Sequence, residues 1–347
     1  MVVVTGAAEG LGAAIAGRLG ATGHFRQVVG LDSTRSTADG VTWRRGDVRD
    51  PRVVESLSGV DALVHLAVSV EPGLDRTDQR DLNLRGTTVV LTAAAAAGIK
   101  RVVLVTSAMV YGALADNPVP LPDDAPLRAQ PEPSPLGDLL EIERMAERYP
   151  RAHPGLEVVV LRPALLLGDG VPAPAGGLLD APRLLMVRGA RPHWQFCHVD
   201  DLAAAVDLAA RGEVSGPATV ASDGWLSQDD VERITGSRRL ELPSTVAFGT
   251  AERLHRIGLS GGPPSELSYL VHPWAVSSER LRAAGWTARY GNEEALTAYV
   301  ESRPALSRAR IGRGVAVGAG AAAGATVAIV GTAALVRRAR RKKQGRG

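Results

Sequence analysis

The N-terminal stretch MVVVTGAAEGLG restricts the fold of this chain more strongly than any other part of the sequence. A run of valines ends at Thr5, glycines follow at Gly6, Gly10 and Gly12, and an alanine-rich stretch comes next. This order predicts a buried strand, a tight turn and a helix. Gly6 permits a sharp exit from the strand, and the missing side chains at Gly10 and Gly12 let a pyrophosphate reach the helix N-terminus. We therefore expect a dinucleotide-binding unit, with an ordinary strand-to-helix turn as the alternative.

A second predicted strand at 27–31 ends at Asp32, about 20 residues after the glycines. An acidic side chain at this place accepts hydrogen bonds from the ribose hydroxyls of NAD and repels the extra phosphate of NADP. Arg35 lies close enough in sequence to weaken that preference. The sequence predicts NAD as the cofactor.

Strand-like and helix-like stretches then alternate through the first half of the chain. Strands are predicted at 41–45, 61–67, 101–106 and 156–162, and helices at 51–57, 78–97 and 137–149. This alternation is typical of a doubly wound parallel α/β sheet, the Rossmann fold. Residues 168–193 are rich in Gly and Pro, 200–211 form a predicted helix, and 213–300 mix short elements. We expect a Rossmann domain at 1–165 and a small α/β substrate-domain cap at 166–302, unless the Rossmann fold takes back the helix at 200–211.

The charged residues are distributed unevenly between the body and the C-terminal tail. Of 40 Lys and Arg residues, eleven lie in 302–347, which contains no Asp or Glu. Residues 1–301 therefore hold 29 basic and 37 acidic residues, a net charge of −8, which gives no reason to expect nucleic-acid binding. Cys197 is the only cysteine, which excludes an internal disulfide, and no Cys/His cluster has the spacing of a metal site. We expect a cytoplasmic body without a secretory signal or a metal.

The C-terminal tail has three parts. A basic linker at 303–313 precedes an uncharged segment at 314–336, and a basic tail follows at 337–347. A helix of 23 residues would extend about 35 Å, enough to cross a bilayer core. Because more basic residues follow the segment than precede it, charge bias would place the C-terminus in the cytoplasm. A cytosolic body requires the opposite orientation, so a helix lying on the membrane surface and a disordered basic tail remain alternatives to a membrane helix.

Six sequence blocks together resemble a known family. They are TGAAEGLG, GDVRD, LVHLA, NLRGTTVVLTAAAAAGIKRVVLVTSAMVYG, VVVLRPALLLG and FCHVDDLAAAV. In this order they resemble the extended short-chain dehydrogenase/reductases, the NAD-dependent epimerase/dehydratase group, over about residues 1–300. The resemblance implies a Rossmann domain with a smaller substrate domain, NAD as cofactor, a homodimer, and a small polar substrate such as a nucleotide sugar.

The resemblance also assigns roles by position. It implies that the pyrophosphate lies against Gly6, Gly10 and Gly12, the adenosine ribose against Asp32, and the adenine between Asp47 and Val48. It places Leu66 and Ala67 along the cofactor groove, Asn83 in the central helix that it steadies, and Arg162 and Pro163 beside the nicotinamide. Ser107 would be the active-site hydroxyl, and His198 and Asp200 match a structural motif near the substrate domain.

Two departures from the family pattern affect these expectations. The glycine spacing is TGxxxGxG rather than TGxxGxxG, which preserves dinucleotide binding. The family's catalytic Tyr-x-x-x-Lys is missing, because Leu136 occupies the tyrosine position and Leu140 the lysine position. Residues 112–148 contain neither Tyr nor Lys, so a shifted register does not supply the pair.

Without that pair, the chemical roles remain open. Ser107 either orients a substrate hydroxyl or is simply the hydroxyl at a strand end. Carboxylates at Asp138, Glu141 and Glu143 either replace the acid/base or complement the helix dipole. The segment His193, Trp194 and Gln195 either lines a substrate pocket or packs in the core.

Two functions therefore remain. The first is an NAD-binding epimerase/dehydratase-like enzyme with reduced or altered catalysis, and we expect no more than trace activity from the missing pair. The second is a non-catalytic NAD-binding sensor or scaffold at the membrane. Both need the cofactor site, and the missing tyrosine and lysine favour the second.

Overall fold

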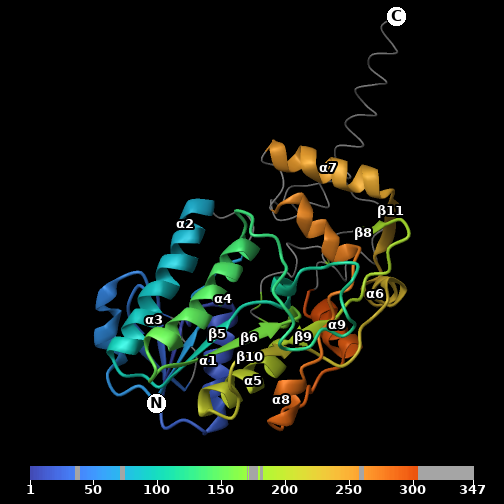
Figure 1. Cartoon of the computed structure of the whole chain (residues 1–347). Coiled ribbons are helices and arrows are strands. Elements are labelled where there is room, and N and C mark those ends of the chain that lie inside the picture. Colours follow the sequence, from blue (N-terminus) through green and yellow to red (C-terminus); the bar gives the residue numbers. More distant parts are fainter. Residues whose placement is uncertain are drawn as a thin grey trace, which may run out of the picture.

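Seven parallel strands form the central sheet of the computed structural model, which describes residues 1–35, 40–70, 75–169, 171, 179, 183–257 and 262–303. The order across the sheet is β10-β6-β5-β4-β1-β2-β3 (Figure 1). The strands are β1 (Val2–Thr5), β2 (Val28–Asp32), β3 (Val41–Arg45), β4 (Ala62–His65), β5 (Arg101–Val105), β6 (Glu157–Pro163) and β10 (Pro217–Val220). The reversal of strand order beside β1 is that of a doubly wound Rossmann fold, as the sequence predicts.

The valine-rich strands lie in the middle of the sheet because they are apolar on both faces. All four residues of β1 and of β4 are buried, and β1 pairs in register with β2 on one side and β4 on the other. Helices cover both faces, so a strand here has no side that meets water. Because these strands run parallel, the carboxyl ends of β1, β2 and β4 lie at one edge of the sheet.

Helices pack on the sheet in two layers. Helix α1 (Gly10–Thr22) contacts α5 (Val199–Arg211), and α5 also contacts β4, β5 and β6. Helices α3 (Thr87–Ala96) and α4 (Pro135–Ala152) contact each other, and the 3₁₀ helix η1 (Pro51–Leu57) contacts α3. The predicted helix at 200–211 therefore lies on the Rossmann sheet, and β10 extends that sheet beyond residue 165.

The single helix expected at 78–97 is divided into three segments. These are α2 (Arg76–Arg80), the π-helical turn η2 (Asp81–Gly86) and α3. The Asn83 amide donates to the carbonyl oxygen of Ser69 and accepts from its N–H, both at 2.8 Å, and Thr87 donates its hydroxyl to the Asn83 carbonyl. These contacts coincide with the wider turn, which is common at functional sites.

The cap consists of two small parallel sheets and several short helices (Figure 1). Its strands are β7 (Leu165–Leu167), β8 (Arg183–Val187), β9 (Phe196–His198) and β11 (Arg238–Leu242). Its helices are α6 (Gln228–Thr235), α7 (Ser244–Arg256), the 3₁₀ turn η5 (Pro264–Leu270), α8 (Glu279–Ala283) and α9 (Asn292–Glu301). Asp123 joins the two parts, because its carboxylate accepts from Thr219 in β10 and from the Arg280 backbone in α8.

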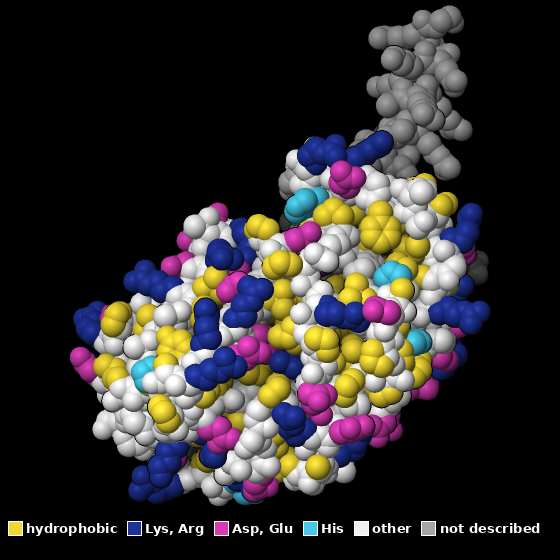
Figure 2. All heavy atoms as spheres, viewed as in Figure 1, with side chains coloured by type: hydrophobic (Ala, Val, Ile, Leu, Met, Phe, Trp, Pro, Cys, Tyr) yellow, Lys and Arg dark blue, Asp and Glu magenta, His cyan; other side chains and the backbone are white. Residues whose placement is uncertain are grey.

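The predicted linker, hydrophobic helix and basic tail lie outside the described residues, except for Arg303, the first residue of the linker. Among the described helices, none combines the length and the apolar character needed to cross a membrane. Basic and acidic side chains are interspersed over the face seen in Figure 2 rather than gathered into one field.

Candidate functional site

The glycine loop after β1 forms a tight cradle. Gly6 has a left-handed φ of 68°, and a β-carbon on it would lie 2.7 Å from the Ala67 backbone nitrogen. A β-carbon on Gly12 would overlap the carbonyl oxygen of Gly6. Gly10, with a φ of 58°, begins α1, and the side chain of Glu9 does not cap that helix. The loop therefore leaves its backbone and the first N–H groups of α1 open to a phosphate, which fits a dinucleotide.

Asp32 and the end of β4 border this cradle. The Asp32 carboxylate accepts from the backbone N–H groups of Ala8 and Thr34, each at 3.2 Å, which places it across the glycine loop. Leu66 and Ala67 are half-buried, and the N–H of Leu66 donates to the Thr5 side chain. The structure thus brings together the glycines, Asp32 and the Leu66–Ala67 segment, as the sequence predicts for one cofactor site.

His65 stabilises the end of β1, where the glycine loop begins. It is fully buried between Thr5, whose hydroxyl lies 2.7 Å from Nδ1, and Thr87, whose hydroxyl lies 3.1 Å from Nε2. Burial lowers the pKa of His65 to about 4, so the ring is neutral at pH 7. It therefore links β1, β4 and α3 without adding a charge near the phosphates.

Asp47 and Val48 follow β3 and make different contacts. The Asp47 carboxylate forms a bidentate pair with Arg49, at 3.0 and 2.8 Å, and this pair lowers its pKa. Val48 is buried, and its side chain would lie 3.1 Å from a β-carbon on Gly86. Their contact with adenine remains a prediction from the resemblance.

Asn83 connects the segment after β4 with helix α4. Besides its bonds to Ser69, its amide donates to Asp138 at 3.1 Å. Asp138 is completely buried and pairs with Arg76 at 2.6 Å and with Arg80 at 2.8 Å. The Asp138 carboxylate is therefore held by three donors, an arrangement suited to fixing α4 rather than to exchanging a proton.

The other two carboxylates of α4 are also paired. Glu143 is buried against Arg162, with 3.0 Å from Nε and 2.8 Å from Nη2, and it accepts the Thr106 hydroxyl at 2.6 Å. Glu141 pairs with Arg144 near the surface. The Arg162 guanidinium also donates to the Tyr111 hydroxyl at 2.8 Å, and burial raises the pKa of Tyr111 to about 12. Arg162 thus forms a buried network under α4, and its neighbour Pro163 ends β6.

Ser107 lies at the carboxyl end of β5 and is half-buried. Its hydroxyl accepts from the N–H of Met109 at 3.2 Å and caps the 3₁₀ turn η3 (Ala108–Tyr111). Leu136 and Leu140 are both buried on α4, so their positions offer no proton donor or acceptor. The catalytic role of Ser107 remains a prediction.

The cap residues singled out in the sequence mostly pack inside it. Trp194 donates to Gln228 at 2.9 Å, and Gln195 bonds the backbone of Ser222 and Val276. His198 caps α5 through the Asp200 N–H and stacks on Tyr290 with ring centroids 3.7 Å apart. Asp200 pairs with Arg18 of α1.

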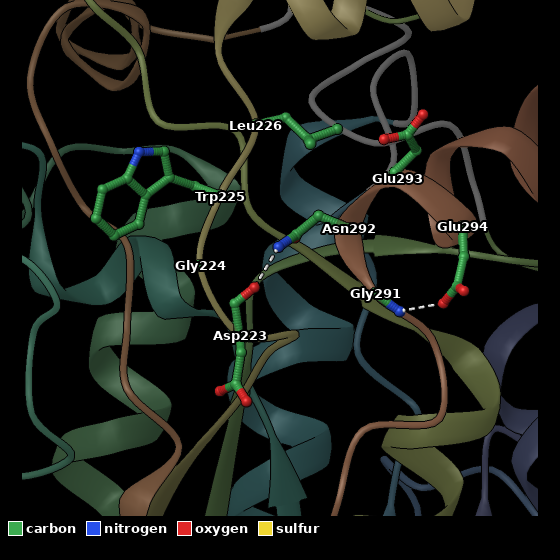
Figure 3. Close-up of a pocket in the computed structure, with 8 residues that line it drawn as sticks. All are labelled: Asp223, Gly224, Trp225, Leu226, Gly291, Asn292, Glu293 and Glu294. Atoms are coloured by element: carbon green, nitrogen blue, oxygen red, sulfur yellow. Dashed lines mark hydrogen bonds between the residues drawn. The ribbon is translucent and has the colours of Figure 1, made fainter.

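A shallow hollow of about 450 Å³ lies on the cap (Figure 3). Its lining residues are Asp223, Gly224, Trp225, Leu226, Gly291, Asn292, Glu293 and Glu294. Asn292 donates to the Asp223 carbonyl at 2.9 Å, so part of the wall is fixed, and the Trp225 and His193 rings lie tilted against each other with centroids 4.5 Å apart. Asn292, Glu293 and Glu294 already form hydrogen bonds to other residues of the cap. None of the predicted cofactor residues lines the hollow.

Two residues of η5 are not marked by any sequence motif. Tyr269 of η5 donates its hydroxyl to the Met109 carbonyl at 2.6 Å, and Glu266 lies one 3₁₀ turn before it. No group of three His, Cys, Asp or Glu residues in the described parts of the chain could hold a metal ion.

A glycine cradle at the carboxyl edge of a seven-stranded Rossmann sheet defines a dinucleotide-binding protein. The chain belongs to the NAD-dependent epimerase/dehydratase family, whose model matches residues 2–220. NAD is the cofactor of this family, and the cradle with Asp32 fits it.

Three known proteins illustrate the likeness. Sterol demethylase protein B of Methylococcus capsulatus is 31% identical over 224 residues, 61% of this chain and 67% of that protein. A dTDP-glucose 4,6-dehydratase of Bacillus anthracis in complex with NAD matches with a TM-score of 0.65 at 15% identity, over 86% of this chain and 95% of that one. MoeE5 in complex with UDP-glucuronic acid and NAD matches with a TM-score of 0.65 at 24% identity, over 88% and 98%. The two structures share the fold of this chain.

Proposed function

We propose that this chain is an NAD(H)-binding epimerase/dehydratase-like protein that acts on a hydroxyl or keto group of a nucleotide sugar or a similarly polar molecule. The observation that carries the proposal is the cradle formed by Gly6, Gly12 and Asp32. A β-carbon on Gly6 would collide with the backbone at Ala67, and one on Gly12 would collide with the carbonyl of Gly6, so only glycine permits this loop, and Asp32 lies across it. The solved neighbours that hold NAD with a sugar nucleotide, or act on one by name, support the substrate class.

We also propose that the residues divide the work in the following way. The glycine loop and the N-terminus of α1 would hold the pyrophosphate, and Asp32 the adenosine ribose. NAD would supply hydride transfer, while the Ser107 hydroxyl would orient the substrate. Because Leu136 and Leu140 occupy the positions of the family's tyrosine and lysine and cannot exchange a proton, proton transfer must differ from the family pattern.

The experiment is a binding and turnover assay on the full chain. The chain is incubated with NAD and a panel of UDP-sugars and dTDP-sugars, with one sterol included because of the relative named for sterol demethylation. Cofactor absorbance and product mass give the readout. Binding of NAD together with conversion of a sugar nucleotide supports the proposal, and absence of NAD binding contradicts it.

A second candidate function is a non-catalytic NAD-binding sensor or scaffold. It is favoured by the two buried leucines, Leu136 and Leu140. General acid/base catalysis typically raises a reaction rate by about 10²–10⁴-fold, and a leucine side chain cannot provide it. Under this alternative NAD binds, and no substrate of the panel is converted. Substituting Leu136→Tyr with Leu140→Lys would then create activity that the unmodified chain lacks.

A further inference from the structure

We propose that Arg45, the last residue of β3, is a second residue that determines the choice of cofactor, because its guanidinium would pair with the 2′-phosphate of NADP. Asp32 would oppose NADP and Arg45 would favour it, from two adjacent strands of one site. Arg35 is the arginine that the sequence indicates for this effect, whereas the structure places Arg45 against the residue that follows Asp32. The inference concerns cofactor choice, so it applies to the enzyme and to the sensor alike.

The pairing of β2 with β3 sets Arg45 beside Asp32. The two strands run parallel, and Asp32 is the register partner of Arg45. The pairing continues beyond them, since the N–H of Gly46 donates to the Asp32 carbonyl at 2.9 Å. Neighbouring strands of a sheet lie about 4.8 Å apart. The backbone of Arg45 is therefore held next to the residue that would bind the adenosine ribose.

Asp32 and Arg45 project from the same face of the sheet. Along a strand, successive side chains alternate between the two faces, and register partners share a face. Two positions earlier, Gly30 pairs with Trp43, and a β-carbon on Gly30 would lie 2.8 Å from the Trp43 ring. Gly30 and Trp43 therefore share a face. By the alternation, Asp32 and Arg45 share that same face.

This face of the sheet carries the glycine loop. The Asp32 carboxylate accepts from the N–H of Ala8 in that loop, at 3.2 Å. Arg44 projects from the opposite face, where it donates to the carbonyl oxygen of Ser56 in η1. Arg45 thus belongs to the cofactor side of the sheet, and Arg44 belongs to the other side.

The Arg45 side chain extends along the end of β2. Its Nε donates to the carbonyl oxygen of Ser33 at 3.1 Å, and Ser33 directly follows Asp32. The Asp32 carboxylate is held by other donors, the N–H groups of Ala8 and Thr34 and the Ser33 hydroxyl. The cation therefore lies beside the ribose-binding residue without being used to hold its carboxylate.

The guanidinium keeps donors that suit an anion. Its Nε–H is engaged by Ser33, which leaves the N–H groups of Nη1 and Nη2. Among the described residues no carboxylate forms an ion pair with Arg45, and its side chain is exposed. A planar guanidinium binds phosphate through parallel N–H···O bonds. Arg45 therefore has the charge, the donors and the location to bind a phosphate on the adenosine ribose.

Asp32 and Arg45 would act in opposite directions on NADP alone. The carboxylate repels a 2′-phosphate, and the guanidinium attracts it. The 2′-hydroxyl of NAD donates to the carboxylate and requires no cation. The preference for NAD would consequently depend on Asp32 and be limited by Arg45.

The test measures the affinities of NAD and NADP by calorimetry in the full chain and in Arg45→Ala, with Arg44→Ala as the matched control. The control removes the same type of side chain one position away, from the other face of the sheet. A hydrogen-bonded contact with a phosphate is worth about tenfold in affinity, so Arg45→Ala should weaken NADP by about that factor and change NAD by less than about threefold. Arg44→Ala should leave the ratio of the two affinities unchanged.

The comparison is repeated in Asp32→Asn, which removes the charge and retains an oxygen that can accept from Ala8. In this variant NADP should bind about as tightly as NAD, and adding Arg45→Ala should weaken NADP alone, by about tenfold. Adding Arg35→Ala instead should have a smaller effect, since Arg35 lies beyond the end of β2. Adenosine 2′,5′-bisphosphate and AMP serve as probes that lack the nicotinamide half and should show the same difference.

Each outcome decides for or against Arg45. Loss of NADP affinity with NAD affinity retained supports the proposal. An equal loss for both cofactors would show that Arg45 only stabilises the end of β2, and it overturns the proposal. Unchanged affinities also overturn it, as does a loss that follows Arg35→Ala rather than Arg45→Ala. A wild type that binds neither cofactor contradicts the cofactor site itself and this role with it.

Discussion

Gly12 of helix α1 packs against the carbonyl group of Gly6 so closely that a β-carbon on Gly12 would overlap the oxygen. On its other side, Gly6 lies against the backbone of Ala67, which follows β4. The contact therefore joins the ends of β1 and β4 to the start of α1. It holds the backbone of the loop where a pyrophosphate can reach it.

Gly12→Ala should weaken NAD binding at least tenfold and lower the free energy of unfolding by about 1–3 kcal/mol, because α1 must move away from β1. The control is Gly17→Ala in the same helix, where a β-carbon meets no atom within 4 Å. That change should preserve NAD binding and raise stability by up to about 1 kcal/mol. Calorimetry and denaturant titration give the two quantities. Equal NAD affinity in both variants would refute this account of the loop.

The buried pair of Arg162 and Glu143 gives a second prediction. Arg162→Met leaves the Glu143 carboxylate buried without its partner and should lower the free energy of unfolding by about 3–5 kcal/mol. Adding Glu143→Leu should recover much of that loss. Arg144→Met removes a more exposed pair with Glu141 on the same helix and should cost less than about 1 kcal/mol. Similar losses for the Arg162 and Arg144 variants would contradict the buried network.

A third prediction concerns stability and pH at Glu266. The folded state holds its pKa at about 7, above the ordinary 4.5, so folding favours the protonated carboxyl. That contribution is full below about pH 4.5 and is lost as the pH rises through about 7. Glu266→Gln stays neutral, so it should exceed the wild type in stability at pH 8 by on the order of 2 kcal/mol and match it at pH 4.5. A difference independent of pH would show that the carboxyl is not perturbed in the folded state.

The fourth prediction rests on sequence alone. Deleting residues 312–347 should move the protein from the membrane fraction to the soluble fraction, because the deletion removes the uncharged segment and its basic flanks. A wash at high salt distinguishes a surface helix, which it releases, from a spanning one. Full-length protein that is already soluble at low salt would disprove the prediction.

The cofactor half of the site was predictable because its determinants are local. The valines of β1, the glycines and Asp32 lie within 32 residues, and each limits the backbone or the chemistry directly. The Rossmann strand order follows from the alternation of apolar strands and helices. The π-helical turn at Asn83 was missed, because it accompanies contacts with Ser69 that no helical periodicity reveals.

The contacts made by helix α4 and by the cap were not predictable in the same way. Asp138 has the pattern of an acidic residue at a helix N-terminus, yet its partner Arg80 is 58 residues away in sequence. Tyr269 and Met109 are separated by 160 residues, in a region whose elements are short and without clear periodicity. Contacts of this kind depend on how the cap docks, so a single sequence does not indicate them.

Calorimetric titration of the full chain with NAD and with NADP tests the central claim most directly. Asp32 borders the glycine cradle, where its carboxylate would accept from the 2′-hydroxyl of NAD and repel the 2′-phosphate of NADP. We predict saturable binding of NAD, at least tenfold weaker binding of NADP, and loss of most of this preference in Asp32→Ala. No binding of NAD, or NADP binding that is equal or tighter, would contradict the account.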